Sequence, residues 1–539
     1  MALTPPARAG LFDAKVLAAI VTATLVFRVW LAWLTPITGD EAYFIWWGWA
    51  PDWGFYDHPP MIGWWLAALS MLGDTALVLR AATIVQPLLL ALAIAWAVPR
   101  LWPGIEPARR NALFLLVLLA PANVWNVFVT TDTPLVYFSV LSGLAWLRAV
   151  QRRPGDGFGW FVLCGALLAG AVLSKYFVAL LGFAYLVDAL RLRRRGIWAG
   201  LAAVYAMCVP ALALMAWWNA GHCWPNYMFN FVNRNADASF SWVTPLLYLV
   251  TLLYVFSPPA AWLAVRRTLD PLPAGPPADP AAAVDVTRRP ATTVVSLVVL
   301  AGVPLVLFGL LSGPKTIGLH WLLSFVPFVL IWVALRVSLP TLQRLGYFFV
   351  SFAVVHVAAA LVIAQLPLET WRNHGSYQSA VLTVDGAGIK AVLAHDLADT
   401  EKDWVPAMDG YSNAITLAWN LKRYVMVFGV GSPHARHDDI MTDLRALDGR
   451  NLLILRKTAP DPADYRPHFR SVEVRELTER GARFWIVLGR GFAYGAYRDG
   501  VLADIRRRWY AIPAWLPVRA CYFCERHFPD APCRPPSSS

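Results

Sequence analysis

Long apolar segments separated by short polar stretches fill the first two thirds of the chain, and this pattern stops near residue 366. Eleven segments are long enough to cross a lipid bilayer as helices. They cover residues 16–36, 75–99, 111–130, 134–150, 159–173, 176–190, 197–218, 243–265, 292–311, 318–336 and 346–366. Residues 59–73 form a further apolar segment that can insert partly. The pattern predicts a polytopic α-helical membrane domain over residues 1–366, with about eleven to thirteen transmembrane helices.

Residues 367–539 have the mixed pattern of a soluble domain. Runs rich in β-branched and aromatic residues at Tyr424–Val430, Asn451–Leu455 and Phe484–Leu488 alternate with helix-like stretches such as Asn413–Leu421. Strand-like and helical segments that alternate in this way are typical of α/β domains. We therefore expect a small C-terminal α/β domain after the membrane domain.

The composition agrees with this division. Hydrophobic residues make up 58% of the chain and charged residues 15%, against about 45–50% and 25% in soluble proteins. Residues 1–366 carry 23 Lys and Arg and 14 Asp and Glu, whereas the much shorter 367–539 carries 23 and 20. These values exclude a fully soluble enzyme and a disordered scaffold. The net charge of +12 comes with no nucleic-acid-binding motif, so we expect a lipid bilayer and no nucleic acid as partner.

Lys and Arg are distributed unequally between the two alternating sets of loops. One set holds eighteen of them and consists of residues 1–15, 100–110, 148–153, 191–195, 266–289 and 336–344. The other set, 37–60, 131–133, 174–175, 219–242 and 312–317, holds only Lys175, Arg234 and Lys315. Loops rich in positive charge face the cytoplasm. The sequence therefore predicts a multi-pass protein of the bacterial inner membrane, with a cytoplasmic N-terminus and a periplasmic C-terminal domain.

The first outer loop, residues 37–74, concentrates candidate chemistry. Between residues 39 and 65 it contains the acids Asp40, Glu41, Asp52 and Asp57, no Lys or Arg, and ten aromatic residues. Aromatic residues are ordinary anchors at a membrane interface, but four carboxylates without a local cation are not. Partial dehydration raises the pKa of a carboxylate there and makes it a better base. The aromatic faces suit a sugar ring or an isoprenoid chain.

Local structure offers a second explanation for the same residues. Asp40 and Glu41 are suited to the N-terminus of a helix that starts near Ala42. The run Asp57-His58-Pro59-Pro60 suits a turn that restarts a helix, because Pro is favoured at a first helical position. The concentration of acids and aromatic residues on one loop favours a functional role.

Lys175, Arg234 and Lys315 stand where the topology disfavours positive charge, so we expect each to have a partner. A lipid phosphate or pyrophosphate is one such partner, because Lys and Arg donate charge-assisted hydrogen bonds to its oxygens. Pairing with an outer acid, such as Asp132 or Asp237, is the alternative.

The cysteines near the C-terminus, Cys521, Cys524 and Cys533, lie close to His527. With His527 they resemble a four-ligand zinc set only loosely, because no second Cys-x-x-Cys pair is present. Outside the cytoplasm a disulfide is favoured over zinc.

The first loop also carries a resemblance. Asp40-Glu41-Ala42-Tyr43 and the run from Asp52 to Met61, Asp-Trp-Gly-Phe-Tyr-Asp-His-Pro-Pro-Met, resemble the first periplasmic loop of bacterial GT-C glycosyltransferases, in particular the aminoarabinose-transferase-like branch related to the protein O-mannosyltransferases. The runs 130–134, 173–176 and 224–231 are similar to loop runs of the same proteins. The resemblance covers most of the chain, including the soluble domain.

The resemblance implies the GT-C fold and an inverting transfer of a sugar from a polyprenyl-phosphate donor. It implies that Asp40 is the catalytic acid residue, which deprotonates or orients the acceptor. We expect substrate contacts from Glu41, Tyr56, Asp57, His58, Asp132, Lys175, Arg234 and Lys315. Aminoarabinose transferases have acid-Lys-Pro-Pro where this chain has Asp57-His58-Pro-Pro. Because His is mostly neutral near pH 7, we expect phosphate binding to depend more on the three cations.

The mechanism requires no metal or other cofactor, although Asp40 with Asp132 offers ligands for a divalent ion such as related oligosaccharyltransferases use. The expected acceptor is lipid A or the core of lipopolysaccharide, with protein as the alternative. A transporter of polyprenyl-linked sugars is a competing interpretation, but transporters place more ionisable groups within their spans. Polysaccharide polymerases and ligases concentrate their charges in late loops instead.

Overall fold

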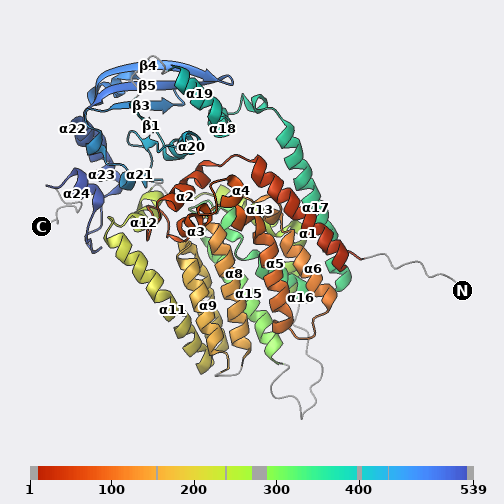
Figure 1. Ribbon diagram of the computed structural model, residues 1–539. Helices are drawn as coiled ribbons and strands as arrows, with labels where there is room; N and C mark the ends of the chain where they lie inside the picture. The colour runs from red at the N-terminus through yellow and green to blue at the C-terminus, as the bar shows by residue number, and fades with distance from the viewer. Residues whose placement is uncertain are drawn as a thin grey trace, which may run out of the picture. The chain divides into compact units, whose positions relative to one another are not determined.

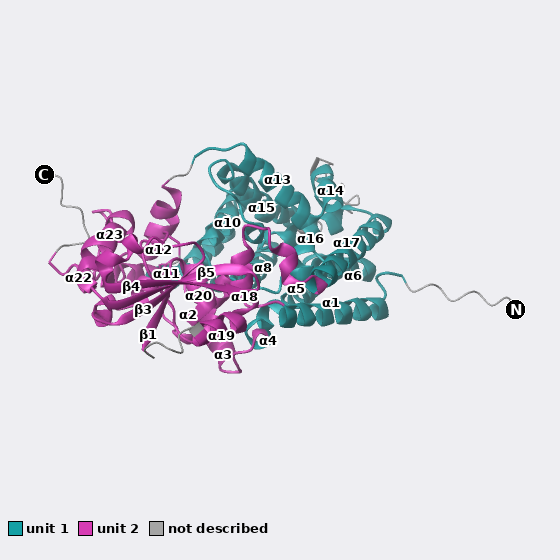
Figure 2. Cartoon of the chain, turned by 90° about the horizontal axis from the view of Figure 1, so that it is seen from above, with its two compact units in different colours: residues 1–34, 77–213, 238–364 teal, residues 35–76, 214–237, 365–539 magenta. Residues whose placement is uncertain are grey.

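The computed structural model of the chain describes residues 10–152, 156–236, 239–269, 288–396, 403–434 and 436–530. The chain forms two compact units, each built from segments that are distant in sequence. The first unit comprises residues 1–34, 77–213 and 238–364, and the second comprises 35–76, 214–237 and 365–539 (Figure 2). The second unit therefore contains the C-terminal domain and also the whole of the first outer loop.

The first unit is a bundle of apolar helices (Figure 1). They are α1 Ala14–Leu34, α5 Ala81–Leu101, α6 Pro107–Leu118, α7 Pro121–Trp125, α8 Asp132–Gln151, α9 Phe158–Val172, α10 Ala179–Leu192, most of α11 Arg195–Ala220, α13 Val243–Phe256, α14 Pro258–Leu269, α15 Arg288–Leu311, α16 Val326–Arg336 and α17 Leu339–Gln365. Among the described residues six helices are long and apolar enough to cross a membrane, or seven if the bent pair α13 and α14 forms one span. The predicted fold class, a polytopic helical membrane protein with a small C-terminal sheet domain, is confirmed.

Two of the predicted spans are interrupted by proline. The segment 111–130 is not one helix, because α6 ends at Leu118 and Pro121 begins the separate helix α7. The segment 243–265 bends by 98° between α13 and α14. The bend lies at Ser257, directly before Pro258. Proline lacks the N–H that would continue the preceding helix.

The segment 318–336 is also shorter as an α-helix than predicted. Residues Leu319–Leu322 form a 3₁₀ turn, and α16 begins only at Val326. Eleven apolar segments were predicted to cross the membrane, whereas six or seven of the described helices are long and apolar enough to do so.

Buried arginines connect helices within the first unit. Arg28 of α1 donates hydrogen bonds to the carbonyl oxygens of Thr83 at 2.6 Å and Asn126 at 2.8 Å. Arg80 donates to the carbonyl oxygen of Ala32 at 2.7 Å. These bonds satisfy charged groups that would otherwise be costly inside the bundle.

The second unit contains a five-stranded sheet with the order β2-β1-β3-β5-β4. Its strands are β1 Trp404–Met408, β2 Met426–Val427, β3 Asn451–Arg456, β4 Phe469–Glu479 and β5 Ala482–Phe492. Strands β2, β1 and β3 are parallel, and β5 and β4 continue the sheet antiparallel. The predicted strands at 451–455 and 484–488 lie in β3 and β5, and the predicted run 424–430 contains β2.

Helices complete the second unit (Figure 1). They include α2 Gly39–Trp49, α3 Met61–Ser70, α12 Pro225–Tyr227, α18 Tyr377–Val384, α19 Gly386–Asp396, α20 Tyr411–Leu421, α22 Tyr494–Tyr497, α23 Ala503–Trp509 and α24 Tyr522–His527. Helix α2 packs against both α3 and α20. This packing places the first-loop acids on the α/β domain.

Candidate active site

Helix α2 begins with a capping box that fixes the two adjacent acids in different directions. The side chain of Thr38 accepts a hydrogen bond from the N–H of Glu41, and the Glu41 carboxylate accepts from the Thr38 N–H at 3.1 Å. Glu41 is fully buried, whereas Asp40 is exposed. Glu41 therefore holds the start of the helix, the structural alternative raised for it above, and Asp40 is the acid presented to solvent.

The start of α2 lies unusually close to α20. A Cβ atom on Gly39 would lie 2.4 Å from the Ser412 Oγ atom and 3.1 Å from the Ser412 carbonyl oxygen. Only a glycine permits this approach. It brings Tyr411, at the start of α20, within reach of Asp40, whose side chain hydrogen-bonds the Tyr411 hydroxyl.

The pKa of Asp40 is raised above its ordinary value. The main cause is desolvation by the surrounding protein, even though the carboxylate reaches solvent, and the neighbouring Glu41 adds to the rise. The hydrogen bond from Tyr411 and the nearby His434 oppose it, because both favour the ionised form. Asp40 is thus an exposed carboxylate with strengthened basicity.

Asp57 is the second acid of the cluster, and it is buried. Desolvation raises its pKa to about 7; the charge of Asp40 adds to the rise, and Arg234 opposes it. Its Oδ1 atom has no hydrogen-bond donor among the described residues. His58 lies beside it, with Nδ1 3.6 Å from Asp57 Oδ2.

Arg234 supplies the positive charge of this cluster. It lies on the short 3₁₀ turn Asn233–Asn235, and its guanidinium stands 5.8 Å from the centre of the Phe229 ring. Burial lowers its pKa, while Asp57 and Tyr411 raise it. The structure thus brings together Asp40, Asp57, His58 and Arg234, four of the predicted site residues, within the second unit. We call these four residues with Tyr411 the carboxylate cluster.

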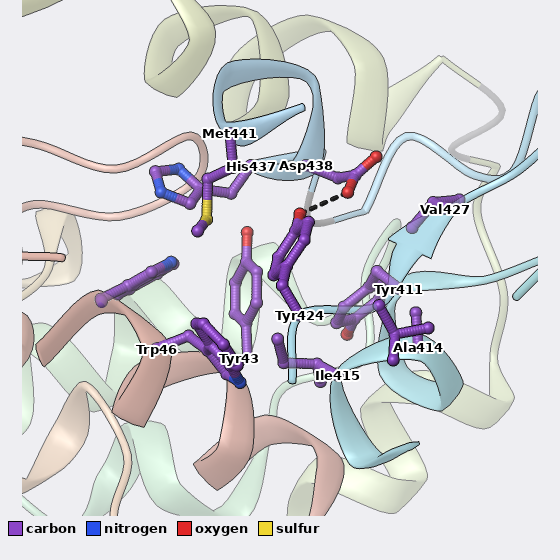
Figure 3. Close-up of a pocket in the computed structure, with 12 residues that line it drawn as sticks. Tyr43, Trp46, Tyr411, Ala414, Ile415, Tyr424, Val427, His437, Asp438 and Met441 are labelled. Atoms are coloured by element: carbon purple, nitrogen blue, oxygen red, sulfur yellow. Dashed lines mark hydrogen bonds between the residues drawn. The ribbon is translucent and has the colours of Figure 1, made fainter. Parts of the chain in front are cut away.

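A small cavity lies beside the cluster, between α2 and the elements around α20 (Figure 3). It offers about 20 Å³ to the centres of water-sized molecules, which is room for one or two waters and too little for a sugar. The indole N–H groups of Trp46 and Trp47 and the Nδ1 atom of His437 have no partner among the described residues. Burial lowers the pKa of His437 to about 3, so its ring is neutral. Buried polar groups of this kind are usually satisfied by ordered water.

Three other predicted residues lie in the first unit. Lys175 Nζ is 2.6 Å from Asp132 Oδ2, and both side chains are buried. Lys175 therefore has the acid partner that was the alternative to a phosphate. His320 Nε2 lies 3.7 Å from the same Asp132 oxygen, and Lys315 Nζ lies 6.0 Å from the centre of the Trp321 ring. This second group combines two lysines, one aspartate and a half-exposed histidine.

Tyr56, which we expected to contact the substrate, is buried in the structure. Only 1% of it is exposed, and its ring packs against Phe229 in the core of the second unit. This side chain is therefore not exposed to solvent. Asp237, raised above as a partner for the cations, lies outside the described residues.

Tyr411 and His320 are the site residues that the sequence did not indicate. Tyr411 lies in the α/β domain, where no neighbouring motif marks it. His320 follows Lys315 by five residues at the end of an outer loop. That proximity to one of the three outer cations was the available signal.

Cys521 and Cys524 are both disulfide-bonded, which agrees with the expectation that favoured a disulfide over zinc. Cys521 forms a disulfide with Cys223, across 298 residues of sequence. Cys521 is therefore not available as a zinc ligand, because its sulfur is already bonded; Cys533 lies outside the described residues. Among the residues that the structure describes, no group of three or more His, Cys, Asp or Glu is arranged to hold a metal ion.

Three comparisons relate the chain to known proteins. Residues 57–219 match the dolichyl-phosphate-mannose-protein mannosyltransferase family. The lipid A galacturonosyltransferase RgtD of Rhizobium johnstonii is 29% identical over 191 residues, which are 34% of this chain and 38% of that protein. The crystal structure of ArnT from Cupriavidus metallidurans bound to undecaprenyl phosphate has a TM-score of 0.58 at 17% identity, and the match covers 87% of this chain and 97% of ArnT.

These matches confirm the resemblance to the aminoarabinose-transferase-like GT-C glycosyltransferases. The likeness to ArnT shows the fold over most of the chain. The family match includes Asp57, His58, Asp132 and Lys175. The match to the lipid A galacturonosyltransferase spans less than two fifths of that relative's length.

Proposed function

We propose that this chain, which has the fold of the aminoarabinose-transferase-like GT-C glycosyltransferases, transfers a sugar from a polyprenyl-phosphate donor to an acceptor at the outer face of the bacterial inner membrane. The observation that carries the proposal is the carboxylate cluster. It combines an exposed acid of raised pKa, Asp40, with a hydrogen-bonding tyrosine and an arginine. A base and a cation in one place are what glycosyl transfer from a phosphate donor needs.

In the proposed step, an acceptor hydroxyl oxygen attacks the anomeric carbon of the donor sugar. The bond between that carbon and the phosphate oxygen breaks, its electron pair leaves with the polyprenyl phosphate, and the hydroxyl proton passes to Asp40. Attack from the side opposite the leaving group inverts the anomeric centre. If the acceptor is a phosphate, it carries no proton to remove, and Asp40 orients it.

The growing negative charge on the leaving phosphate requires cations. Arg234 of the carboxylate cluster and Lys175 and Lys315 of the first unit are the candidates, because each can donate charge-assisted hydrogen bonds to phosphate oxygens. Lys175 already neutralises Asp132, so Arg234 and Lys315 are the stronger candidates. Fixed cations can stabilise this charge without a metal ion.

The proposed acceptor is lipid A or the lipopolysaccharide core. The similarity to a lipid A galacturonosyltransferase supports this choice, and the solved ArnT complex with undecaprenyl phosphate supports the donor class. A protein acceptor is the second candidate, because the matched family is described as protein mannosyltransferases.

The test is the mass spectrum of lipid A and core oligosaccharide from the native host. We compare wild type, a deletion strain, and the deletion complemented with Asp40→Asn or with Asp74→Asn. Asp74 is an exposed acid at the end of the same loop and serves as the matched control. We expect one sugar to be lost in the deletion and with Asp40→Asn, and restored by Asp74→Asn.

Each other outcome contradicts a defined part of the proposal. A sugar retained with Asp40→Asn, at equal protein level in the membrane, removes Asp40 from the catalytic role. Unchanged spectra in the deletion overturn the lipid acceptor, and loss of sugar from envelope proteins would then establish the protein acceptor. Unchanged lipids and proteins together would favour the transporter.

A further inference from the structure

The C-terminal segment, residues 510–521, is fixed to the last turn of α11. The backbone N–H groups of Arg519 and Ala520 both donate to the carbonyl oxygen of Ala220, at 2.8 and 3.1 Å. One residue further on, Cys521 is bonded to Cys223 by the disulfide. A covalent bond and two hydrogen bonds thus hold this segment at the end of a helix that is long enough to span a membrane.

The end of α11 has the properties of a membrane interface. The helix has 26 residues, its most apolar 18-residue stretch has a mean hydropathy of 2.0, and it begins at a cluster of arginines. About 20 residues cross the hydrocarbon layer, so a span that starts at Ile197 ends near Trp217. Val209, Ala213 and Trp217 are all exposed and follow one another at four-residue spacing on one face of the helix. Trp217 therefore ends an apolar stripe at the depth where tryptophan is enriched.

An exposed aromatic patch continues from this point across the C-terminal segment. It consists of Tyr227, Phe231 and Trp515, whose rings are in contact, together with Trp217, which contacts Arg519 of the same segment. Trp217 is 49% exposed, Phe231 60% and Trp515 69%. The Tyr227 ring lies 5.5 Å from Trp515 and 5.3 Å from Phe231, measured between ring centroids. Large aromatic side chains that are so exposed and adjacent mark an interaction surface.

The charge around the aromatic patch suits phospholipids. Residues 505–524 contain four arginines and no Asp or Glu. Arg507 and Arg508 are paired with Asp504 at 2.9 and 2.8 Å. Arg519 is exposed, and its guanidinium lies 4.8 Å from the centre of the Trp217 ring. A guanidinium beside an interfacial tryptophan is placed to bind a lipid phosphate.

We propose that residues 510–521 and the aromatic patch form a membrane-interface anchor. In it, the aromatic side chains enter the boundary between lipid headgroups and acyl chains, and Arg519 binds a phospholipid phosphate. The anchor is continuous with the lipid-facing stripe of α11, and the disulfide keeps the two parts together.

The anchor also acts on the carboxylate cluster. Asn230 lies one residue before Phe231 of the patch and donates a hydrogen bond to the carbonyl oxygen of Asp57 at 2.9 Å. Asn226, beside Tyr227, donates to the carbonyl oxygen of Tyr56 at 3.1 Å. Through these bonds the anchor holds the Asp57 loop at headgroup depth, where the phosphate of a lipid-linked donor lies.

The test measures the depth of a spin label in the full-length protein in lipid nanodiscs. The label is attached to Ala514→Cys, an exposed alanine next to Trp515, and the matched control is Ser471→Cys, an exposed serine on β4. The free cysteines among the described residues, Cys164 and Cys208, are buried, and the unsubstituted protein gives the background. We expect the label at 514 to collide more with oxygen than with a water-soluble nickel complex, and the label at 471 to show the reverse. If the label at position 514 collides more with the nickel complex than with oxygen, the proposed anchor is overturned.

A second measurement tests the role of Arg519. Nanodiscs of phosphatidylcholine alone are compared with nanodiscs that contain phosphatidylglycerol, with and without Arg519→Gln. We expect the label at 514 to move deeper with the anionic lipid, and the substitution to abolish that movement. Equal depth with and without Arg519→Gln in both lipids overturns phosphate binding by Arg519. Neither measurement involves sugar transfer, so the result is independent of the proposed function.

Discussion

The hydroxyl of Tyr411 contacts the one acid of the carboxylate cluster that is exposed to solvent. This tyrosine comes from the α/β domain, and its hydrogen bond lowers the pKa of Asp40 against the effect of desolvation. The bond therefore favours the ionised carboxylate, which is the form that a base or an orienting group requires. Tyr411 is in this sense a positioning residue that also adjusts the charge of Asp40.

Tyr411→Phe removes this bond and leaves the ring in place. The pKa of Asp40 then rises further, so the acidic limb of the pH–rate profile moves to higher pH. At mildly acidic pH we expect transfer to slow by roughly tenfold or more, the effect of one hydrogen bond to a charged group. The measurement is the rate of sugar transfer against pH with purified protein in nanodiscs.

Tyr424→Phe is the matched control for this experiment. Tyr424 lines the same small cavity, but its hydroxyl donates to Asp438 instead of Asp40 (Figure 3). We expect the control to leave the acidic limb unchanged. Equal profiles for Tyr411→Phe and the unsubstituted protein would show that Tyr411 does not influence Asp40.

The titration of Asp57 makes the stability of the folded protein depend on pH. Its pKa is about 7 in the folded protein, against an ordinary value of 3.8. The folded state therefore holds a proton between about pH 4 and pH 7 that the unfolded state has lost, and its stability falls as the pH rises through this range. Above pH 7 the full penalty of a buried carboxylate is present.

Asp57→Asn removes the ionisable group with little change of shape. We expect the unfolding temperature of the variant to equal that of the unsubstituted protein near pH 4 and to exceed it above pH 7 by at least about 2 °C, since 1 kcal/mol shifts a domain of this size by roughly 2–4 °C. Thermal unfolding followed in detergent across this pH range provides the measurement. A constant difference at all pH values would mean that Asp57 does not titrate as the structure indicates.

Residue type carries the information that the sequence alone provides about the site. Asp40, Asp57 and Arg234 could be predicted because charged residues are conspicuous in outer loops of a membrane protein, and the structure brings these three together. Tyr411 could not, because a tyrosine at the start of a helix has no unusual property until tertiary packing places it against α2. The burial of Tyr56 could not be predicted either, because aromatic residues are common both in cores and at interfaces.

At the scale of elements, the contact between α2 and α20 determines the geometry of the cluster. Gly39 has no side chain to separate the two helices. Gly39→Ala adds a methyl group against Ser412, so the start of α2 must move away from α20 and take Asp40 away from Tyr411. Alanine also favours a helix by roughly 0.5–1 kcal/mol relative to glycine. We therefore expect Gly39→Ala to slow sugar transfer. In free energy, the rise of the activation barrier for transfer should exceed the loss in the free energy of unfolding.

A second substitution tests this explanation. Ser412→Ala removes the oxygen that would lie 2.4 Å from the new Cβ atom, so the double variant is expected to recover part of the activity. Gly495→Ala on α22 is the control, because nothing lies within 4 Å of its added Cβ atom. Activity lost equally with and without Ser412→Ala would contradict the close contact as the cause.

The elements of the α/β domain were predictable where apolar runs are continuous. Strand β3, Asn-Leu-Leu-Ile-Leu-Arg, is buried at its four central residues and was found at its observed position. Strand β4 was missed because its sequence, Phe-Arg-Ser-Val-Glu-Val-Arg-Glu-Leu-Thr-Glu, is an edge strand with mostly charged and half-exposed positions. Strand β1 was missed because it is only five residues long and contains a proline. Edge pairing and burial by neighbours are properties of the sheet, so local sequence does not reveal them.

At the scale of the whole molecule, the disulfide and the basic loops both bear on which side of the membrane the C-terminal domain occupies. Cys223 lies in an outer loop of the predicted topology, and Cys521 lies in the predicted periplasmic domain. A disulfide between them agrees with the predicted topology, in which both lie on one side of the membrane in an oxidising compartment. The distribution of Lys and Arg, eighteen in one set of loops and three in the other, predicts the same side of the membrane independently of the cysteines. The pairing itself could not be predicted, because cysteine spacing does not define connectivity.

Labelling with a membrane-impermeant maleimide tests the orientation directly. Ser471→Cys marks the C-terminal domain, and Gln343→Cys, an exposed residue near the start of α17, marks a predicted cytoplasmic loop. In intact spheroplasts we expect the label to react at position 471 and to react at position 343 only after lysis. The reverse result would place the carboxylate cluster and the disulfide in the cytoplasm. A donor presented at the periplasmic face would then not reach Asp40, and the proposed transfer would have to be abandoned together with the topology.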